Sequence, residues 1–191
     1  TEIKIEGLID GVKFLHDINL GRKIEPKDKV MIVGGGNVAI DCARTCLRLG
    51  YREVTIVYRR SRAEMPGIME EVEAAEEEGV KINFLATPIK ILAENGKVTG
   101  AECIRMELGE PDASGRKRPI PTKGSEFILE ADMIIPAIGE EPDLSFLTEA
   151  DQIQTTQQGT IEVKLNNCQT SRVGVFSGGD CVTGPATLIE A

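Results

Sequence analysis

The sequence predicts an α/β protein in which a Rossmann-like parallel sheet carries helices on both faces and is accompanied by an antiparallel β-meander. Three observations predict this fold class. An unbroken apolar run at 30–33 is typical of a parallel strand covered on both faces. A glycine turn, a helical pattern over 37–49 and a second apolar run at 54–58 follow, and together they form a β-α-β unit. Further on, alternating strand patterns flank the tight turn Asn95-Gly96, as in an antiparallel hairpin.

The glycine turn after the first strand has the spacing of a dinucleotide-binding loop. Gly34, Gly36 and Ala39 fit the pattern G-x-G-x-x-A. In that pattern the first glycine permits a tight turn, the second lets a pyrophosphate approach the backbone, and the small third residue lets helix pack on strand. The helix N-terminus then offers unpaired N–H groups to the phosphates. The sequence therefore predicts a dinucleotide site; the alternative is that the glycines only serve a tight strand-to-helix turn.

The end of the second strand indicates which dinucleotide binds. An NAD site places a carboxylate at this tip, about 20 residues after the glycines, where it holds the ribose 2′-hydroxyl. Here the tip carries Arg59 and Arg60, with Arg62 just beyond, and the only acid expected nearby, Glu53, lies at the other end of the strand. Guanidinium groups suit a dianionic 2′-phosphate, so NADP(H) is favoured. The alternative is that the arginines are solvated charges that pair with the acidic helix that follows.

The other elements are predicted from periodicity. A helix over 12–18 contains His16, the single histidine, for which a surface or packing role is favoured over catalysis or metal binding. A second crossover helix runs from Pro66 to Gly79, with six glutamates on a solvated face and no metal site. The remaining strands are expected at 80–85 in the parallel sheet, at 88–92, 98–108 and 126–130 in the meander, at 131–139 back in the parallel sheet and at 173–179, with a polar loop at 110–124.

Composition restricts the classes of function. With 191 residues, 41% of them hydrophobic, the chain can bury one sizeable core and a small second lobe. A net charge of -9 and few aromatic residues argue against nucleic acid or an anionic membrane as the partner. No apolar run reaches the ~20 residues of a membrane span, and no signal-peptide pattern is found, so a cytoplasmic location is expected. The cysteines include no C-x-x-C pair, so neither a thioredoxin-like redox centre nor an iron–sulfur ligand set is expected; Cys42 and Cys46 are interpreted as packing residues.

Four motifs in one order resemble a known family. They are GGGNVAIDCARTCLRLG from Gly34, VTIVYRRSRAEMP from Val54, ADMIIPAIG from Ala131 and FSGGDCVTGPATLIEA from Phe176. Together they closely resemble the FAD- and NADPH-dependent oxidoreductases typified by the small (β) subunit of glutamate synthase, with the matching half of dihydropyrimidine dehydrogenase as a relative. The resemblance implies the NADPH-binding domain of a flavoprotein with two dinucleotide-binding folds. The family's FAD glycine fingerprint and iron–sulfur cysteines are missing here, so we expect this chain to be part of a longer polypeptide and to be inactive by itself.

The resemblance also implies a division of the chain and roles for particular residues. The division is a lead-in segment of the FAD domain with a helix at 1–28, an NADP(H)-binding Rossmann-like domain with the meander at 29–145, and a return segment toward the FAD domain at 146–191, ending in a helix from Ala186. The pyrophosphate loop would contain Gly34, Gly35, Gly36, Asn37 and Val38; Arg59 and Arg60 would hold the 2′-phosphate; Ala137, Ile138 and Gly139 would approach the nicotinamide; and Gly179 and Asp180 would touch the ribitol of FAD.

The implied function is to pass a hydride from NADPH to FAD and to send electrons through iron–sulfur centres to a large subunit or another acceptor. No catalytic side chain or metal ligand is assigned. The same electron-input module could instead serve a ferredoxin-NADP or pyrimidine-type reductase. A non-catalytic module that senses NADP(H) is an alternative from another class, and the FSGGD passage counts against it. A methyltransferase-like fold is disfavoured by the paired arginines, since its adenosyl ligand has no 2′-phosphate.

Overall fold

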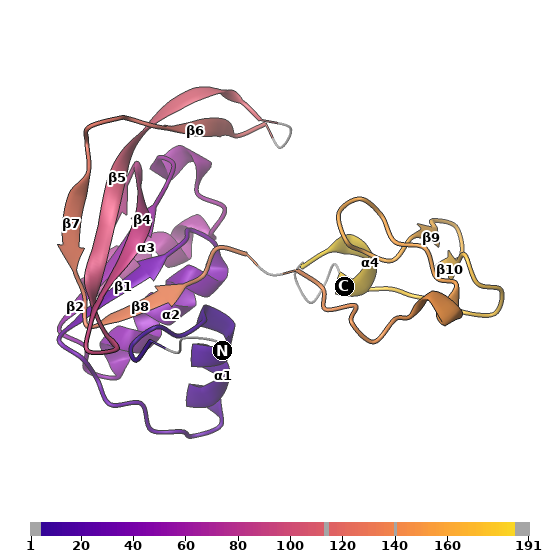
Figure 1. Cartoon of the computed structure of the whole chain (residues 1–191), viewed down its shortest axis with the longest axis horizontal. Helices are drawn as coiled ribbons and strands as arrows, with labels where there is room; N and C mark the ends of the chain where they lie inside the picture. The colour runs from indigo at the N-terminus through magenta and orange to yellow at the C-terminus, as the bar shows by residue number, and fades with distance from the viewer. Residues whose placement is uncertain (1–4, 113–114, 140, 186–191) are drawn as a thin grey trace. The chain divides into compact units, whose positions relative to one another are not determined.

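The computed structural model describes residues 5–112, 115–139 and 141–185 (Figure 1). The chain divides into two compact units, the first ending at Ile138 and the second beginning at Gly139. The helix expected from Ala186 lies outside the described residues. None of the helices within these ranges is both long and apolar enough to cross a membrane.

A parallel sheet with the strand order β3-β2-β1-β8 forms the centre of the first unit. Helix α2 connects β1 to β2, and α3 lies between β2 and β3 in the chain, so the predicted β-α-β unit and the return of the chain to this sheet are confirmed. The second crossover helix begins at Met69, later than the predicted Pro66. The bounds are β1 Lys29–Val33, α2 Asn37–Arg48, β2 Glu53–Tyr58, the short 3-10 helix η1 Arg62–Glu64, α3 Met69–Glu77, β3 Lys81–Phe84 and β8 Met133–Pro136.

An antiparallel sheet follows β3 in the chain. Strands β4 and β5 are joined by Asn95 and Gly96, whose φ angles of 51° and 78° are those of the two-residue hairpin that the sequence predicted. The prediction of a loop over 110–124 is wrong, because β5 continues to Pro111 and β6 pairs with its second half. Three prolines and several charges obscured the strand pattern there, and Pro119 and Pro121 are accommodated in a short partner strand. The bounds are β4 Ala86–Glu94, β5 Lys97–Pro111, β6 Lys117–Pro121 and β7 Phe127–Glu130.

Helix α1 (Gly11–Asn19) belongs to the first unit. It begins at the N-cap Asp10, whose carboxylate accepts a hydrogen bond from Lys13 N at 3.0 Å. Just before it, Ile134 N donates to Gly7 O at 2.8 Å, so the N-terminal segment lies along β8. The assignment of residues 1–28 to an FAD domain stays a prediction. In the described part of this segment, Phe14 is buried in the core of the first unit and Ile9 packs against that core. His16 has a 62% exposed side chain, in agreement with the predicted surface role.

The helices cover one face of the parallel sheet, so the prediction of helices on both faces is wrong. Alternate residues of a strand point to opposite faces. Ile32 and Ile56 pack in one buried cluster with residues of α1, α2 and α3, whereas Met31 and Val57 pack in a second cluster with Ala101 of β5. The antiparallel sheet therefore covers the second face. An apolar strand indicates burial on both faces, but it does not indicate whether a helix or a sheet covers each one.

The two cysteines of α2 are packing residues, as predicted. Cys42 and Cys46 are fully buried in the helix-side cluster. Burial raises the pKa of the Cys42 thiol to about 12, and it also raises the pKa of Cys46. Both thiols are therefore protonated at neutral pH and poor nucleophiles.

The second unit is built mostly from turns and short elements. Its short helix α4 (Asp180–Thr183) begins after Gly179, and Ile161 N donates to Cys181 O at 2.7 Å. The strand predicted at 173–179 is wrong: an isolated bridge joins Phe176 to Gln169, and no extended ladder forms there. Its other elements are the 3-10 helix η2 Glu149–Asp151 and the paired strands β9 Val163–Lys164 and β10 Gln169–Thr170.

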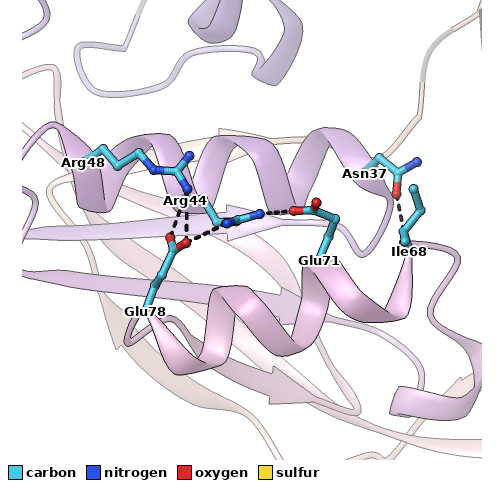
Figure 2. Close-up of polar contacts among 6 residues, drawn as sticks. All are labelled: Asn37, Arg44, Arg48, Ile68, Glu71 and Glu78. Atoms are coloured by element: carbon cyan, nitrogen blue, oxygen red, sulfur yellow. Dashed lines mark hydrogen bonds and ion pairs between the residues drawn. The ribbon is translucent and has the colours of Figure 1, made fainter.

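Ion pairs join α2 to the acidic face of α3, as Figure 2 shows. Arg44, whose side chain is 18% exposed, contacts the carboxylates of Glu71 and Glu78, with its Nη2 2.6 Å from Glu78 Oε1. Arg48 Nη2 lies 3.1 Å from the same oxygen. With Glu76, which pairs with Arg62, three of the six glutamates predicted to be solvated are bound to arginines. Because α2 starts at the glycine loop, these contacts also help to hold that loop.

These contacts predict a pH-dependent contribution to stability. The hydrogen bond from Arg44 holds the pKa of Glu78 below its ordinary value, with Arg48 adding to the effect. A carboxylate with a lowered folded-state pKa stabilises the fold above its unfolded pKa, and this contribution is lost as the pH falls through the folded-state value. We expect Glu78→Gln to unfold at a lower temperature than the wild type near neutral pH, and we expect the gap to close below about pH 4.

Thermal unfolding followed by circular dichroism checks this expectation. Glu73→Gln is the matched control, because Glu73 is exposed on the same helix and forms no ion pair among the described residues. A Glu78→Gln deficit that stays constant through the acid range would contradict the assignment to this ion pair.

Candidate dinucleotide-binding site

The glycine loop lies where the strand order of the parallel sheet reverses. From β1 the chain proceeds outward through β2 and β3, while β8 pairs with the other side of β1. Ligands of open α/β sheets bind at such switch points, outside the carboxyl ends of the strands. Gly34 directly follows β1 and Ala137 directly follows β8, so the structure brings these two predicted site residues together.

Gly34 occupies a position that has no room for a side chain. Its φ of +145° is strained for an L-residue, and a Cβ there would lie 2.1 Å from the carbonyl oxygen of Ala137. Gly34 N donates to Val57 O at 3.1 Å, and Ala137 N donates to Val33 O at 2.7 Å. Gly34 therefore serves the close approach of β1 and β8.

Gly35 packs against the segment that precedes α3. A Cβ on Gly35 would lie 2.5 Å from the ring of Tyr58, and Gly35 O accepts a hydrogen bond from Gly67 N at 3.0 Å. Tyr58 in turn donates its hydroxyl proton to Glu64 O at 2.6 Å. These contacts hold the backbone of the loop from the β2 side.

Gly36 is the open position of the loop. Nothing lies within 4 Å of a Cβ placed on it, and its backbone has an ordinary extended conformation. It is the N-cap of α2 and provides no side-chain hydrogen bond, while its carbonyl accepts from Ala39 N and Ile40 N. The N–H groups at the start of α2 are therefore available to an anion placed over Gly36.

Asn37 and Val38 hold the start of α2 in place. Asn37 Oδ1 accepts a hydrogen bond from Ile68 N at 2.9 Å, as the right side of Figure 2 shows. Val38 packs on the helix-side core, and its Cγ1 would lie 3.2 Å from a Cβ on Gly11 of α1. The side-chain oxygen of Asn37 and the side chain of Val38 thus have structural partners, and the contact of both residues with a pyrophosphate stays a prediction.

A shallow groove runs from Asn37 between the first turns of α2 and α3. It is lined by Asn37, Ile40, Asp41, Ile68 and Glu71. Asp41 makes this groove less favourable for a phosphate, while the second carboxylate, that of Glu71, is paired with Arg44. A pyrophosphate is better accommodated over Gly36.

The arginines at the tip of β2 have different surroundings. Arg59 is exposed, and no carboxylate in the described ranges lies within ion-pairing distance of it. The side chain of Arg62 is 42% exposed; it pairs with Glu76, and its guanidinium lies 5.6 Å from the ring centre of Phe84. The predicted alternative, pairing with the acidic helix, thus applies to Arg62 and not to Arg59.

Arg60 is 5% exposed and has internal partners. Its Nη2 lies 2.6 Å from Asp112 Oδ2, and its Nε donates to Lys117 O at 2.8 Å. Its predicted contact with a 2′-phosphate stays a prediction, and the structure directs this guanidinium toward the β5–β6 hairpin instead.

Glu64 is a residue near the site that the sequence interpretation missed. It lies in η1, its backbone carbonyl accepts from Tyr58, and its carboxylate accepts from the hydroxyl of Ser61. The prediction that Glu53 is the only acid near the β2 tip is therefore wrong. The sequence could have predicted this position, because Glu64 follows Ser61 by three residues, which is the spacing of one tight turn.

The remaining predicted residues lie further along the chain. Ile138 ends the first unit with 79% of its surface exposed, and Gly139 begins the second unit. Gly179 and Asp180 also belong to the second unit, where Gly179 O accepts from Val182 N at 2.8 Å and Asp180 is exposed. Their roles toward nicotinamide and FAD stay predictions.

Comparison with known proteins gives consistent relatives. The model of the pyridine nucleotide-disulphide oxidoreductase family matches residues 2–191. The β subunit of the NADP(+)-dependent formate dehydrogenase of Moorella thermoacetica is 53% identical over 97% of this chain, and the small chain of glutamate synthase [NADPH] of Escherichia coli is 41% identical over 85% of it. This chain spans only 26% and 35% of those two proteins.

The solved structures agree on the fold. Thioredoxin reductase of T. acidophilum superposes with a TM-score of 0.71 at 23% identity, covering 94% of this chain and 51% of the reductase. At this identity the likeness establishes the α/β fold alone. The resemblance to the glutamate synthase small subunit and the predicted α/β class are both confirmed. Because the family model matches nearly the whole chain, the chain belongs to the pyridine nucleotide-disulphide oxidoreductase family.

Proposed function

We propose that the first unit binds NADPH and that the complete protein uses it as the electron donor to a flavin. The observation that carries this proposal is the open Gly36 at an uncapped helix N-terminus, next to an exposed arginine tip. Membership of an oxidoreductase family and the names of the relatives, one NADP(+)-dependent and the other marked NADPH, support it.

The loop fits a pyrophosphate. The space over Gly36 is free, the N–H groups at the start of α2 point out of the helix, and the helix dipole adds a partial positive charge. On the protein side of the loop, Gly34 packs against the backbone of Ala137 and Gly35 packs against the ring of Tyr58. Ala137, Ile138 and Gly139 follow β8 at the same sheet edge and would border the nicotinamide.

The arginine tip fits the 2′-phosphate of NADP(H). Arg59 is exposed and has no competing carboxylate in the described ranges, so it is available for a charge-assisted hydrogen bond. Arg62 adds a second positive charge beside it in the chain, although Glu76 shares that guanidinium. The carboxylate of Glu64, which also lies near the tip, is bound to Ser61.

The test is the nucleotide preference of Arg59→Ala. One or two lost charge-assisted bonds cost about 1.5–3 kcal/mol, so we expect NADPH to bind about 10–100-fold more weakly while NADH is hardly affected. Isothermal titration calorimetry with both nucleotides measures this. Arg52→Ala is the matched control, because Arg52 is an exposed arginine at the opposite end of β2. Equal losses for the two nucleotides would contradict a 2′-phosphate contact.

The wider function is proposed from the relatives. NADPH, when bound, supplies a hydride for a flavin. In this chain the backbone around Gly179 and the exposed carboxylate of Asp180 would hold the ribitol of FAD. Because the relatives are named as subunits or chains of larger enzymes, we infer a partner subunit. As further parts of the same proposal, iron–sulfur centres carry the electrons and the enzyme is cytoplasmic.

A second candidate within this class concerns the electron acceptor. One relative is named as part of a formate dehydrogenase and the other as part of glutamate synthase. The same nucleotide-binding unit therefore accompanies different acceptors, and a complex other than glutamate synthase is an alternative. A non-catalytic NADP(H) sensor is disfavoured by family membership. Stopped-flow flavin reduction by NADPH in the complete protein would exclude the sensor.

A further inference from the structure

Arg60 differs from the other arginines at the tip because its guanidinium is buried and already bound. Its Nη2 lies 2.6 Å from Asp112 Oδ2, and its Nε donates to Lys117 O at 2.8 Å. Asp112 directly follows β5 and Lys117 begins β6, so one side chain contacts both arms of the hairpin. The hairpin ends are thereby fixed to the tip of β2.

Backbone hydrogen bonds connect the same elements independently. Arg60 O accepts from Leu85 N at 3.1 Å, and Leu85 O accepts from Met106 N at 2.8 Å. Met106 is the residue at which β5 begins to pair with β6. Backbone hydrogen bonds thus connect the β2 tip to the residue after β3, and that residue to the middle of β5. The side chain of Arg60 adds a direct contact between the β2 tip and the ends of β5 and β6.

A buried guanidinium needs its counter-ion. Removing Asp112 from Arg60 would leave an uncompensated charge in a site that is 5% exposed, which is strongly unfavourable. A phosphate could replace Asp112 only if the hairpin moved away. Arg59, exposed and adjacent in the chain, needs no such rearrangement.

Resting on the proposed NADPH site, we propose that Arg60 is a positioning residue and that Asp112 and Lys117 determine specificity. Arg60 holds the ends of β5 and β6 as one wall of the 2′-phosphate pocket, while Arg59 makes the direct contact. Because the carbonyl of Lys117 is bound by Arg60 Nε, its exposed side chain starts from a fixed backbone next to the tip. The ammonium group of Lys117 then adds positive charge to this wall.

The proposal predicts whether Asp112→Ala weakens or strengthens NADPH binding. In Asp112→Ala the hairpin loses the ion pair between Asp112 and Arg60, while the bonds to Lys117 O and between the backbones remain, so NADPH should bind about tenfold more weakly and NADH should bind unchanged. If Arg60 were instead a phosphate ligand held back by Asp112, the same substitution would release it, and NADPH would bind more tightly. The two roles of Arg60 therefore give opposite shifts in the NADPH/NADH affinity ratio.

The experiment is isothermal titration calorimetry of NADPH and NADH against wild type, Asp112→Ala, Asp112→Asn, Lys117→Ala and Glu110→Ala. Asp112→Asn keeps an acceptor oxygen for Nη2 and is expected to retain part of the NADPH preference even if Asp112→Ala is poorly folded. Lys117→Ala should lower NADPH affinity alone, and it should reduce the dependence of that affinity on salt. Glu110→Ala removes one exposed negative charge nearby and should change neither affinity.

Three results would overturn this inference without contradicting the proposed NADPH site. These are tighter NADPH binding in Asp112→Ala, equal losses of NADPH and NADH in folded Asp112→Asn, and an unchanged affinity ratio in every Asp112 and Lys117 variant. A wild-type chain that bound NADPH no better than NADH would overturn the proposed function itself. The wild-type titration therefore separates failure of the proposed function from failure of the inference.

Discussion

Gly36→Val is expected to abolish NADPH binding while the first unit stays folded. The valine side chain has space in the free protein, because nothing lies within 4 Å of a Cβ at this position and φ is -86°. In the proposed NADPH complex, that same space is where the pyrophosphate would meet the backbone at the start of α2. Two charge-assisted hydrogen bonds lost at about 1.5–3 kcal/mol each correspond to a loss of affinity of more than about 100-fold.

The measurement is calorimetric titration with NADPH, combined with thermal unfolding by circular dichroism. A β-branched residue is a poor N-cap, so a stability cost of about 1 kcal/mol is expected even without a ligand. Gly178→Ala serves as a control for the general cost of replacing an open glycine, since a Cβ on Gly178 would also meet nothing within 4 Å and its φ lies outside the left-handed region. A folded Gly36→Val that binds NADPH like the wild type would show that the loop is structural only.

The parts of the site that could be predicted are those determined by neighbours in the sequence. The apolar run of β1, the glycine spacing and the helical pattern of α2 lie within one β-α-β unit, and each restricts the others. The Asn95-Gly96 turn was predictable for the same reason, since two residues with φ > 0 specify the hairpin. Local sequence therefore sufficed for the loop and for the exposed Arg59.

The parts that could not be predicted depend on contacts between distant segments. Arg59 and Arg60 are adjacent and identical in type, yet one is exposed and the other is bound by Asp112, 52 residues away. Nothing in the local pattern distinguishes the two arginines. The strand β6, which Arg60 contacts, was not predicted because its prolines are typical of a loop. The covering of the second sheet face by β5 depends likewise on a strand pairing that the apolar pattern of β1 does not specify.

Gly34→Ala is expected to destabilise the first unit strongly, in contrast to Gly36→Ala. A residue with a Cβ pays about 1–3 kcal/mol for an unfavourable backbone conformation such as φ of +145°. The added Cβ would also lie 2.1 Å from Ala137 O, so the ends of β1 and β8 would have to separate, at a further cost of about 1–3 kcal/mol. Against a typical domain stability of about 5–15 kcal/mol, the sum is a large fraction.

Thermal or urea unfolding of Gly34→Ala and Gly36→Ala measures this contrast, with a decrease in Tm of about 10 °C or more expected for Gly34→Ala. The comparison also decides between the two interpretations of the glycine loop. If the glycines only served a tight turn, both positions would affect stability and neither would affect NADPH binding directly. The structure predicts a separation instead: Gly34 is required because two strand ends approach each other, whereas Gly36 is required because a ligand approaches the backbone. Equal stability of the two alanine variants would contradict the close approach of Gly34 to Ala137 and with it the geometry of the switch point.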